Sequence, residues 1–169
     1  MEDIHDPHNV SAILRSADAV GIMEVHLVYI NEKFPRLGKK SSASANKWIQ
    51  RRKFKSITEC YSALRNEGFH ICATHLGVKS SSLFELNLTK KTALVFGNEH
   101  RGVSEEAASL ADENFQIPMI GMIPSLNVSV ACAVTLYEAF RQRSLSGKYA
   151  KPQLSKAQLN ALFDTWTKK

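Results

Sequence analysis

The 169-residue chain lacks the patterns that mark several common classes of protein. Its apolar runs are too short to span a bilayer and its start carries no signal-peptide pattern, so a membrane or secreted protein is not indicated. The three cysteines, Cys60, Cys72 and Cys132, are widely separated, and the absence of any C-x-x-C pair argues against a zinc knuckle or a redox pair. We expect buried, reduced thiols in a cytoplasmic protein.

Signatures for dinucleotides, metals and hydrolysis are missing as well. No G-x-G-x-x-G occurs, and the loop Gly97–Ser104 has Val103-Ser104 where a phosphate-binding P-loop needs Lys followed by Ser or Thr. His5 and His8 are three residues apart but have no further ligands near them, and no H-E-x-x-H is present, so we expect no metal. A Ser-His-Asp mechanism has no nucleophile-elbow motif to support it.

Positive charge is present but concentrated in one segment. Nine basic residues and no acid lie between the two ends of that segment: Lys33, Arg36, Lys39, Lys40, Lys47, Arg51, Arg52, Lys53 and Lys55. The whole chain carries +6, so the remainder is net negative, at −3. Such a patch is typical of a loop that neutralises nucleic-acid phosphates, and its candidate contacts are Lys39, Lys40, Lys47, Arg51, Arg52 and Lys53. A solvated loop that only aids solubility is the alternative.

Short β-branched runs alternate with amphipathic segments, which predicts one α/β domain with a parallel sheet. Strands are expected at 25–30, 69–74, 92–96 and 115–117, and helices from Asp6 to Gly21, at 58–66, 104–110, 127–143 and 156–166. In the long helix at 127–143 the residues expected to face inward are Val130, Val134, Leu136, Tyr137 and Phe140. In such folds ligands bind beyond the carboxyl ends of the strands, so the loops there are the ones to inspect.

The segment from Ile117 to Ser129 is the most unusual of these loops. It contains two prolines and a glycine among apolar residues and has no charge, which favours the lining of a pocket. Near the other end of the chain, Arg15 stands among small and apolar residues. Either it snorkels or pairs with Asp18 or Glu24, or it is a buried cation that awaits a phosphate or a developing negative charge.

Three segments together resemble the three motifs of the SpoU/TrmH family of RNA 2′-O-methyltransferases. The first is His8 to Arg15 followed by Ala19-Val20-Gly21, and the second is Phe96-Gly97-Asn98-Glu99 with Arg101 to Ser104. The third is Ile117-Pro118-Met119, Gly121-Met122 and Ser125 to Ala131. The likeness covers roughly residues 1–145, and its specificity lies in the order and spacing of all three motifs.

The resemblance implies a parallel α/β sheet flanked by helices with a C-terminal deep trefoil knot, a homodimer, and S-adenosylmethionine as cofactor. By the same resemblance, the residues that match the catalytic and substrate-positioning set are Asn9, Arg15, Glu99, Ser125 and Asn127. Those that would contact the cofactor, mostly through the backbone, are Thr74, Gly97, Ile117, Met122 and Leu126. Arg15 would relay a proton through an RNA phosphate or stabilise the developing charge, with Asn9 orienting it and Glu99 holding the second loop or the substrate.

The amino-acid sequences of the motifs most resemble those of tRNA guanosine methyltransferases that act on the D-loop. A ribosomal RNA methyltransferase and a catalytically silent RNA-binding module are the alternatives. We expect a methyltransferase domain at 1–147 and a tail with an amphipathic helix at 148–169. Members that modify tRNA carry a helical stretch before the first strand, whereas here Met1 nearly adjoins the first motif. The start was placed late or the chain is a fragment, which leaves the first strand and part of a tRNA-docking surface in question.

Overall fold

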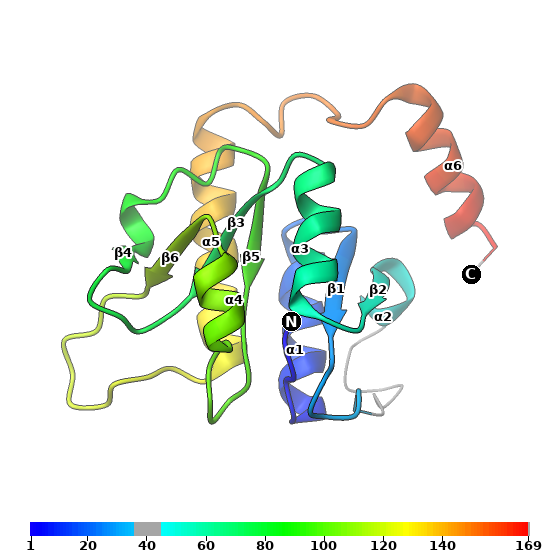
Figure 1. The fold of residues 1–169 in the computed structure, drawn as a ribbon. Helices are drawn as coiled ribbons and strands as arrows, with labels where there is room; N and C mark the ends of the chain where they lie inside the picture. The colour runs from blue at the N-terminus through cyan, green and yellow to red at the C-terminus, as the bar shows by residue number, and fades with distance from the viewer. Residues whose placement is uncertain (36–44, 169) are drawn as a thin grey trace.

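The computed structural model describes residues 1–35 and 45–168 of the chain, and it contains parallel strands joined by crossover helices (Figure 1). The elements in chain order are α1 (Pro7–Ala19), β1 (Glu24–Val28), α2 (Ala45–Trp48), β2 (Gln50–Phe54), α3 (Ile57–Asn66), β3 (His70–Thr74), β4 (Ser81–Ser82), the 3-10 helix η1 (Leu83–Glu85), β5 (Thr92–Val95), α4 (Glu105–Leu110), β6 (Glu113–Gln116), α5 (Val128–Leu145) and α6 (Lys156–Trp166). None of the helices in the described part is long and apolar enough to cross a bilayer.

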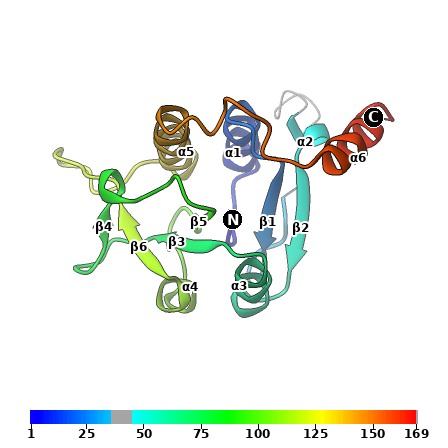
Figure 2. The ribbon, with the colours of Figure 1, turned by 90° about the horizontal axis from the view of Figure 1, so that it is seen from above.

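The parallel strands form two hydrogen-bonded groups, one of two strands and one of four. β1 pairs with β2, and the other four strands follow the order β4-β6-β3-β5. Residues Met1–Asp3 lie between the two groups: the Val28 amide donates to the Met1 carbonyl at 2.9 Å, and the Glu2 amide donates to the Phe96 carbonyl at 2.9 Å. These bonds place the start of the chain between β5 and β1, as Figure 2 shows. The N-terminal segment therefore joins the two groups at their carboxyl ends.

Helices cover both faces of the sheet. α1 and α5 lie on one face and α3 and α4 on the other (Figure 2). One core forms beneath α1 and α5, with Leu14, Phe115 and Leu136 among its buried members. A second core forms beneath α3 and α4 around Tyr61 and Ile71. Full burial of each large apolar side chain stabilises the fold by about 1.5–3 kcal/mol, so the two layers fix the sheet on which the loops stand.

Local sequence signals placed most helix ends correctly. The Asp6 carboxylate accepts a hydrogen bond from the His8 amide at 2.8 Å, with Pro7 at the first helical position. At the other end of α1, Gly21 follows the last helical turn with a φ of 81°, a left-handed conformation that favours glycine. Ser104 caps α4 and Asn127 caps α5, as predicted. The predicted helix at 156–166 forms with the same bounds.

Two predictions were wrong, one for the basic segment that contains β2 and one for the buried side of α5. β2 lies where a continuous basic loop was expected, because its residues Gln50-Arg51-Arg52-Lys53-Phe54 bury only the last side chain and give no alternating pattern. On α5, Val130 and Tyr137 were expected inward, yet they are 47% and 53% exposed. Val134 and Phe140, also expected inward, are 36% and 38% exposed, while Leu136 is buried as predicted. The helix has apolar residues on two sides, so periodicity alone cannot select the buried one.

Candidate functional site

Three loops far apart in sequence meet through a chain of side-chain hydrogen bonds. The Asn9 amide group donates to Glu99 Oε1 at 2.8 Å, and its oxygen accepts from Asn127 Nδ2 at 3.0 Å. Asn9 lies in the first turn of α1, Glu99 in the loop after β5, and Asn127 at the start of α5. The structure therefore brings together three of the five residues predicted as catalytic or substrate-positioning, across sequence separations of 90 and 118 residues.

Glu99 also holds the backbone that leads into α1. Its Oε2 accepts from the His5 amide at 2.9 Å, and its Oε1 accepts from the Asp6 amide at 3.0 Å. Burial by itself raises the pKa of this carboxyl, but the hydrogen bonds from Asn9, His5 and Asp6 outweigh it and lower the pKa below its usual value. The ionised Glu99 thus connects the loop after β5 to the start of α1 through hydrogen bonds.

Asn127 is the N-cap of α5. Its side-chain oxygen accepts from the Ser129 amide at 2.8 Å and from the Ser129 hydroxyl at 2.6 Å, while its amide nitrogen reaches Asn9. A cap in this position satisfies backbone donors that the helix cannot satisfy itself. The start of α5 is therefore fixed relative to α1 by one side chain.

The loop after β5 leaves no room for a side chain at Gly97. A Cβ atom there would lie 2.0 Å from the carbonyl oxygen of Gly102, so only glycine permits this close approach. The next residue, Asn98, is buried and was not predicted as a site residue; its oxygen accepts from the His100 amide at 2.9 Å and its nitrogen donates to the Asp3 carbonyl at 2.8 Å. An asparagine in a loop gives no distinctive sequence signal, which explains why it was missed.

Asp3 is a second missed residue that shapes this edge of the sheet. It is 3% exposed, and its Oδ1 accepts from the Ile30 amide at 2.8 Å while its Oδ2 accepts from Asn31 Nδ2 at 2.9 Å. Burial opposes ionisation, but the donors from Ile30, Asn31 and Glu32 lower the pKa of this carboxyl below its usual value. Asp3 thereby anchors the loop that follows β1.

Arg15 is exposed, so the interpretation of a buried cation was wrong. It makes no hydrogen bond or ion pair with any residue that the structure describes, and Glu24 pairs with His26 at 2.7 Å instead. Asn9 was expected to orient Arg15, but its side-chain amide forms hydrogen bonds with Glu99 and Asn127 instead. The guanidinium is therefore available to a ligand that approaches from solvent.

The residues predicted to contact a cofactor follow neighbouring strands. Thr74 ends β3, Gly97 comes shortly after β5, and Ile117 directly follows β6. These strands are adjacent and parallel, so their carboxyl ends share one edge of the sheet. Thr74 donates its hydroxyl to the Val95 carbonyl at 3.1 Å, which links β3 to β5 at that edge.

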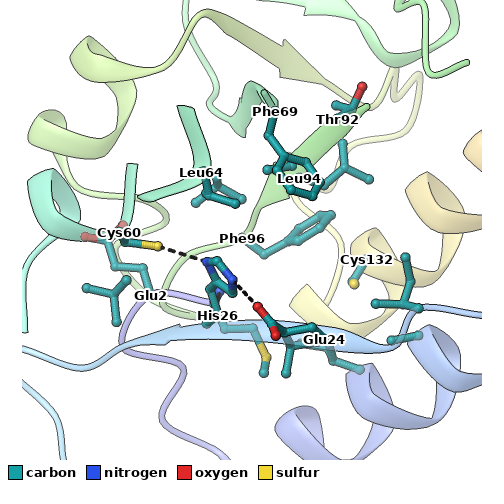
Figure 3. Close-up of a pocket in the computed structure, with 18 of the residues that line it drawn as sticks. Glu2, Glu24, His26, Cys60, Leu64, Phe69, Thr92, Leu94, Phe96 and Cys132 are labelled. Carbon is teal, nitrogen blue, oxygen red and sulfur yellow. Dashed lines mark hydrogen bonds and ion pairs between the residues drawn. The ribbon is translucent and has the colours of Figure 1, made fainter. Parts of the chain in front are cut away.

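The loop from Ile117 to Asn127 is open to solvent at its middle. Met122 is 102% exposed and Leu126 is 40% exposed, and Ser125 is exposed too. The loop carries no charged side chain. None of its residues lines the cavity between β1 and β5 (Figure 3). This uncharged loop offers apolar side chains and backbone groups at the same edge as Gly97.

The predicted RNA contacts divide between two faces of β2. In the register with β1, Arg51 lies opposite Val25 and Lys53 opposite Leu27, whereas Arg52 lies opposite His26. Side chains alternate across a strand, so Arg52 projects to the side opposite to Arg51 and Lys53. The predicted contact Lys47 is exposed on α2. Lys39 and Lys40 lie outside the described residues.

Arg52 is already paired on its side of the sheet. Its Nη1 lies 2.6 Å from Glu67 Oε1 and 3.9 Å from Glu24 Oε1, and the first contact raises the pKa of the guanidinium. Arg51 forms no ion pair within the described part of the chain, and the Lys53 ammonium lies 5.4 Å from the Phe34 ring centroid. The cationic surface that remains for a polyanion is therefore the Arg51 and Lys53 side of β2.

Within the described residues, neither His5 nor His8 belongs to a group of three potential metal ligands. His5 lies 3.2 Å from Glu32. Elsewhere in the described chain, ligand atoms of His70, Cys72 and Glu113 lie within 4.8 Å of one another. Burial raises the pKa of the Cys72 thiol to about 12, and this thiol is part of the apolar core, so we assign no metal to the group.

Comparisons with known proteins agree with the geometry of the three loops. The model of the SpoU rRNA Methylase family matches residues 1–137. A curated relative from Escherichia coli (strain K12), tRNA (guanosine(18)-2′-O)-methyltransferase, is 44% identical over 151 residues, which are 89% of this chain. The chain spans 66% of that relative's length.

Solved structures resemble the fold closely. The Aquifex aeolicus TrmH/SpoU tRNA modifying enzyme superimposes with a TM-score of 0.92 at 38% identity, over 98% of this chain and 84% of that one. The SpoU methyltransferase AviRb from Streptomyces viridochromogenes, in complex with the cofactor AdoMet, gives a TM-score of 0.70 at 30% identity, over 85% of this chain and 56% of that one.

Proposed function

The chain belongs to the SpoU rRNA Methylase family, and from that premise we propose that it transfers the methyl group of S-adenosylmethionine to a ribose 2′-hydroxyl of RNA. The favoured target is a guanosine in the D-loop of tRNA, because the E. coli relative is named for guanosine 18 of tRNA. The observation that carries the proposal is the hydrogen-bonded chain of Glu99, Asn9 and Asn127, which holds the three motif loops together at one edge of the sheet.

The proposed cofactor fits the chemistry of this edge. When bound, it supplies an electrophilic methyl group on a sulfonium cation. The loop from Ile117 to Leu126 has no charge to repel that cation, and its exposed Met122 offers an apolar contact. We propose that Thr74, Gly97, Ile117, Met122 and Leu126 hold it, largely through backbone groups; that AviRb was solved in complex with AdoMet supports the choice of cofactor.

The residues of this chain would orient and activate the ribose. A 2′-hydroxyl is a weak nucleophile until its proton leaves, so its developing charge needs a stabilising partner. The exposed Arg15 guanidinium suits this role, because it stays protonated and has five donors for an RNA phosphate and the reacting oxygen. Ser125 and Asn127 would position the nucleotide, and Glu99 would keep the loops in register. Positioning alone can supply several orders of magnitude in rate.

A transfer assay tests the proposal directly. The protein is incubated with labelled S-adenosylmethionine and unmodified transcripts of tRNA and of ribosomal RNA, and the methylated ribose is mapped. We expect label in tRNA, at a D-loop guanosine. Label in ribosomal RNA alone would replace the tRNA target, and no transfer to either transcript would favour the silent RNA-binding module.

We propose that Arg51 and Lys53, together with Lys39, Lys40 and Lys47, contact the RNA backbone. Replacing Arg51 and Lys53 by glutamine should weaken tRNA binding and reduce the slope of log K against log salt by about 1–2, because each lost phosphate contact removes roughly one released counterion. Filter binding over a range of salt concentrations measures both quantities.

The control is Arg52→Gln, which removes one positive charge from the opposite face of β2. Its guanidinium is engaged by Glu67, so the affinity for tRNA and the salt slope should stay near their original values. An effect of Arg52→Gln about half that of the double variant would show that only net charge matters, and an unaltered tRNA affinity in the double variant would return the patch to the solubility interpretation.

We also propose that the chain forms a homodimer through α5. Four apolar side chains, Val130, Val134, Tyr137 and Phe140, are exposed along one side of that helix, an arrangement that favours a partner surface. Tyr137→Glu should shift the protein toward monomers in sedimentation velocity. Phe163→Glu, which alters an equally apolar and exposed position on α6, should not. A Tyr137→Glu variant that sediments like the original protein would contradict this interface.

The finer features of the fold follow as proposals from the family. We propose that the C-terminal part forms a deep trefoil knot, supported by the family to which the chain belongs, and an experimental chain trace through residues 97–128 checks it. The methyltransferase domain would span 1–147, with 148–169 as a tail whose Trp166 ring packs 5.7 Å from that of Trp48. Limited proteolysis near residue 148 that releases a folded core would support this division. A tRNA substrate supports a cytoplasmic location, which fractionation of cells checks.

A further inference from the structure

The side chain of His8 lies at the edge of the sheet where the three motif loops meet. His8 is in the first turn of α1, and the next residue, Asn9, donates to Glu99 at 2.8 Å and accepts from Asn127 at 3.0 Å. The His8 amide donates to the Asp6 carboxylate at 2.8 Å, which fixes the backbone at this point. The imidazole is therefore attached one residue from the hydrogen-bonded chain that holds the candidate site together.

His8 and Arg15 share one side of α1. Both are exposed, and Ala12, which lies between them on the same side, is half-buried. Residues seven positions apart on an α-helix point in directions that differ by only about 20° and lie about 10 Å apart along its axis. Long side chains on a helix lean toward its N-terminal end, so the Arg15 side chain extends across Ala12 toward His8. A nucleotide that contacts Arg15 is therefore placed to contact His8 as well.

The imidazole of His8 has no partner that would prevent it from accepting a proton. Its ring nitrogens form no hydrogen bond or ion pair with residues 1–35 or 45–168, the part of the chain that the structure describes. In the neighbouring His5, by contrast, Nδ1 lies 3.2 Å from Glu32 Oε2. Histidine is the side chain whose charge changes near neutral pH, and it is the most frequent acceptor in general-base catalysis.

We propose that His8 is the general base of the transfer reaction, a role that rests on the function proposed above. A ring nitrogen of His8 accepts the proton of the ribose 2′-hydroxyl, and Arg15 stabilises the negative charge that develops on the oxygen. The 2′-oxygen forms a bond to the methyl carbon, the bond from that carbon to sulfur breaks, and its electron pair stays on the sulfur as a neutral thioether. Water then takes the proton from His8. Arginine stays protonated, so Arg15 cannot take this proton itself.

The other titratable groups near the start of α1 have different charge properties. Asp6 and Glu99 are carboxylates, and the hydrogen bonds to Glu99 lower its pKa below the usual value, so Glu99 remains ionised near neutral pH. His5, before α1, and His100, in the loop after β5, are the imidazoles at this edge besides His8 among the described residues. A change of rate near neutral pH that depends on His8 alone therefore reports on His8.

The test compares pH profiles of single-turnover methyl transfer to tRNA. The rate of the original protein should rise with pH and level off once the imidazole is neutral, within about pH 5 to 8. His8→Gln should be roughly 100-fold slower at neutral pH, and its rate should keep rising with pH because hydroxide then removes the proton. His100→Gln, which removes an exposed imidazole at the same edge, is the control and should keep the original profile.

The outcomes separate this proposal from the proposed function. An original profile in His8→Gln would overturn the role of His8, and loss of the levelling in His100→Gln would overturn it in favour of His100. Absence of transfer by the original protein would instead contradict the proposed function.

Chemical protection gives a measurement that does not depend on turnover. Diethyl pyrocarbonate modifies neutral imidazoles, and mass spectrometry follows His8 and His70 in the same sample of original protein. Unmodified tRNA at about ten times its Kd, without cofactor, should slow the modification of His8 roughly tenfold. His70, exposed at the first residue of β3 and so at the other end of the strands, should react at the same rate with and without tRNA. Equal modification of His8 in both samples would show that RNA does not cover this imidazole and would overturn the proposal.

Discussion

Replacing Arg15 by alanine is expected to lower methyl transfer to tRNA by roughly 10²–10³-fold, the cost of removing one donor that stabilises developing charge. The fold should not change, because Arg15 is exposed and makes no hydrogen bond or ion pair with the described residues. Single-turnover assays with labelled cofactor measure the chemical step, and thermal unfolding measures stability. Binding of S-adenosylmethionine, followed by calorimetry, should remain near its original strength.

Two further variants of α1 make this result specific. Asp18→Ala removes a charge one turn along from Arg15, on the exposed side of the same helix, and should leave transfer within about twofold. Arg15→Lys keeps the positive charge but loses the planar fork, so a partial rescue indicates that charge is sufficient and no rescue indicates that bidentate contact is needed. Turnover in Arg15→Ala that equals the original would remove Arg15 from the mechanism.

Much of the fold could be predicted from local signals. Asp6-Pro7, Ser104 and Asn127 each place a helix start, and each acts through a side chain that bonds to the backbone two or three residues later. Such contacts lie within one helical turn, so the residues that make them are close in the sequence and can be recognised there. β2 has no such local sequence signal, because its pairing with β1 involves the backbone and its basic side chains stay in solvent.

The candidate site was predictable as a set of residues but not as an arrangement. The family resemblance selected Asn9, Glu99 and Asn127, yet no sequence rule indicates that one amide bridges the other two side chains. The environment of Arg15 shows the same limit: its small and apolar neighbours in sequence point to other sides of the helix, so a buried position did not follow. Which side of a helix meets its neighbours is set by packing between distant elements.

The hydrogen bonds of Glu99 indicate that it positions two helices, a role distinct from catalysis. Its carboxylate accepts from one side chain and two backbone amides, and all of these donors belong to the start of α1 or the residues before it. Through Asn9 and Asn127 the same network reaches the cap of α5. A change at Glu99 should therefore disturb the relative placement of two helices, and both stability and activity should respond.

Glu99→Gln is expected to lower the free energy of unfolding at pH 7 by about 1–2 kcal/mol. The glutamine oxygen can replace Oε1, but its amide group cannot accept from the His5 amide, and the donors on Asn9 and Asp6 lose a charged acceptor; the exposed His5 amide can bind water instead. Urea unfolding measures the difference. Glu105→Gln, an exposed carboxylate at the start of α4, is the control and should change stability by less than about 1 kcal/mol.

The pH dependence of this difference identifies the charged form as its source. The pKa of Glu99 is lower in the folded protein than its ordinary value of 4.5, so the unfolded chain binds the proton more readily. The contribution of the carboxylate is therefore complete above about pH 5 to 6 and is lost as the pH falls through the folded pKa. Other carboxylates titrate in both proteins and cancel, so the gap between the original protein and Glu99→Gln should narrow in acid. A gap that stays constant from neutral pH down to about pH 3 would show that the ionised carboxylate contributes nothing beyond its shape.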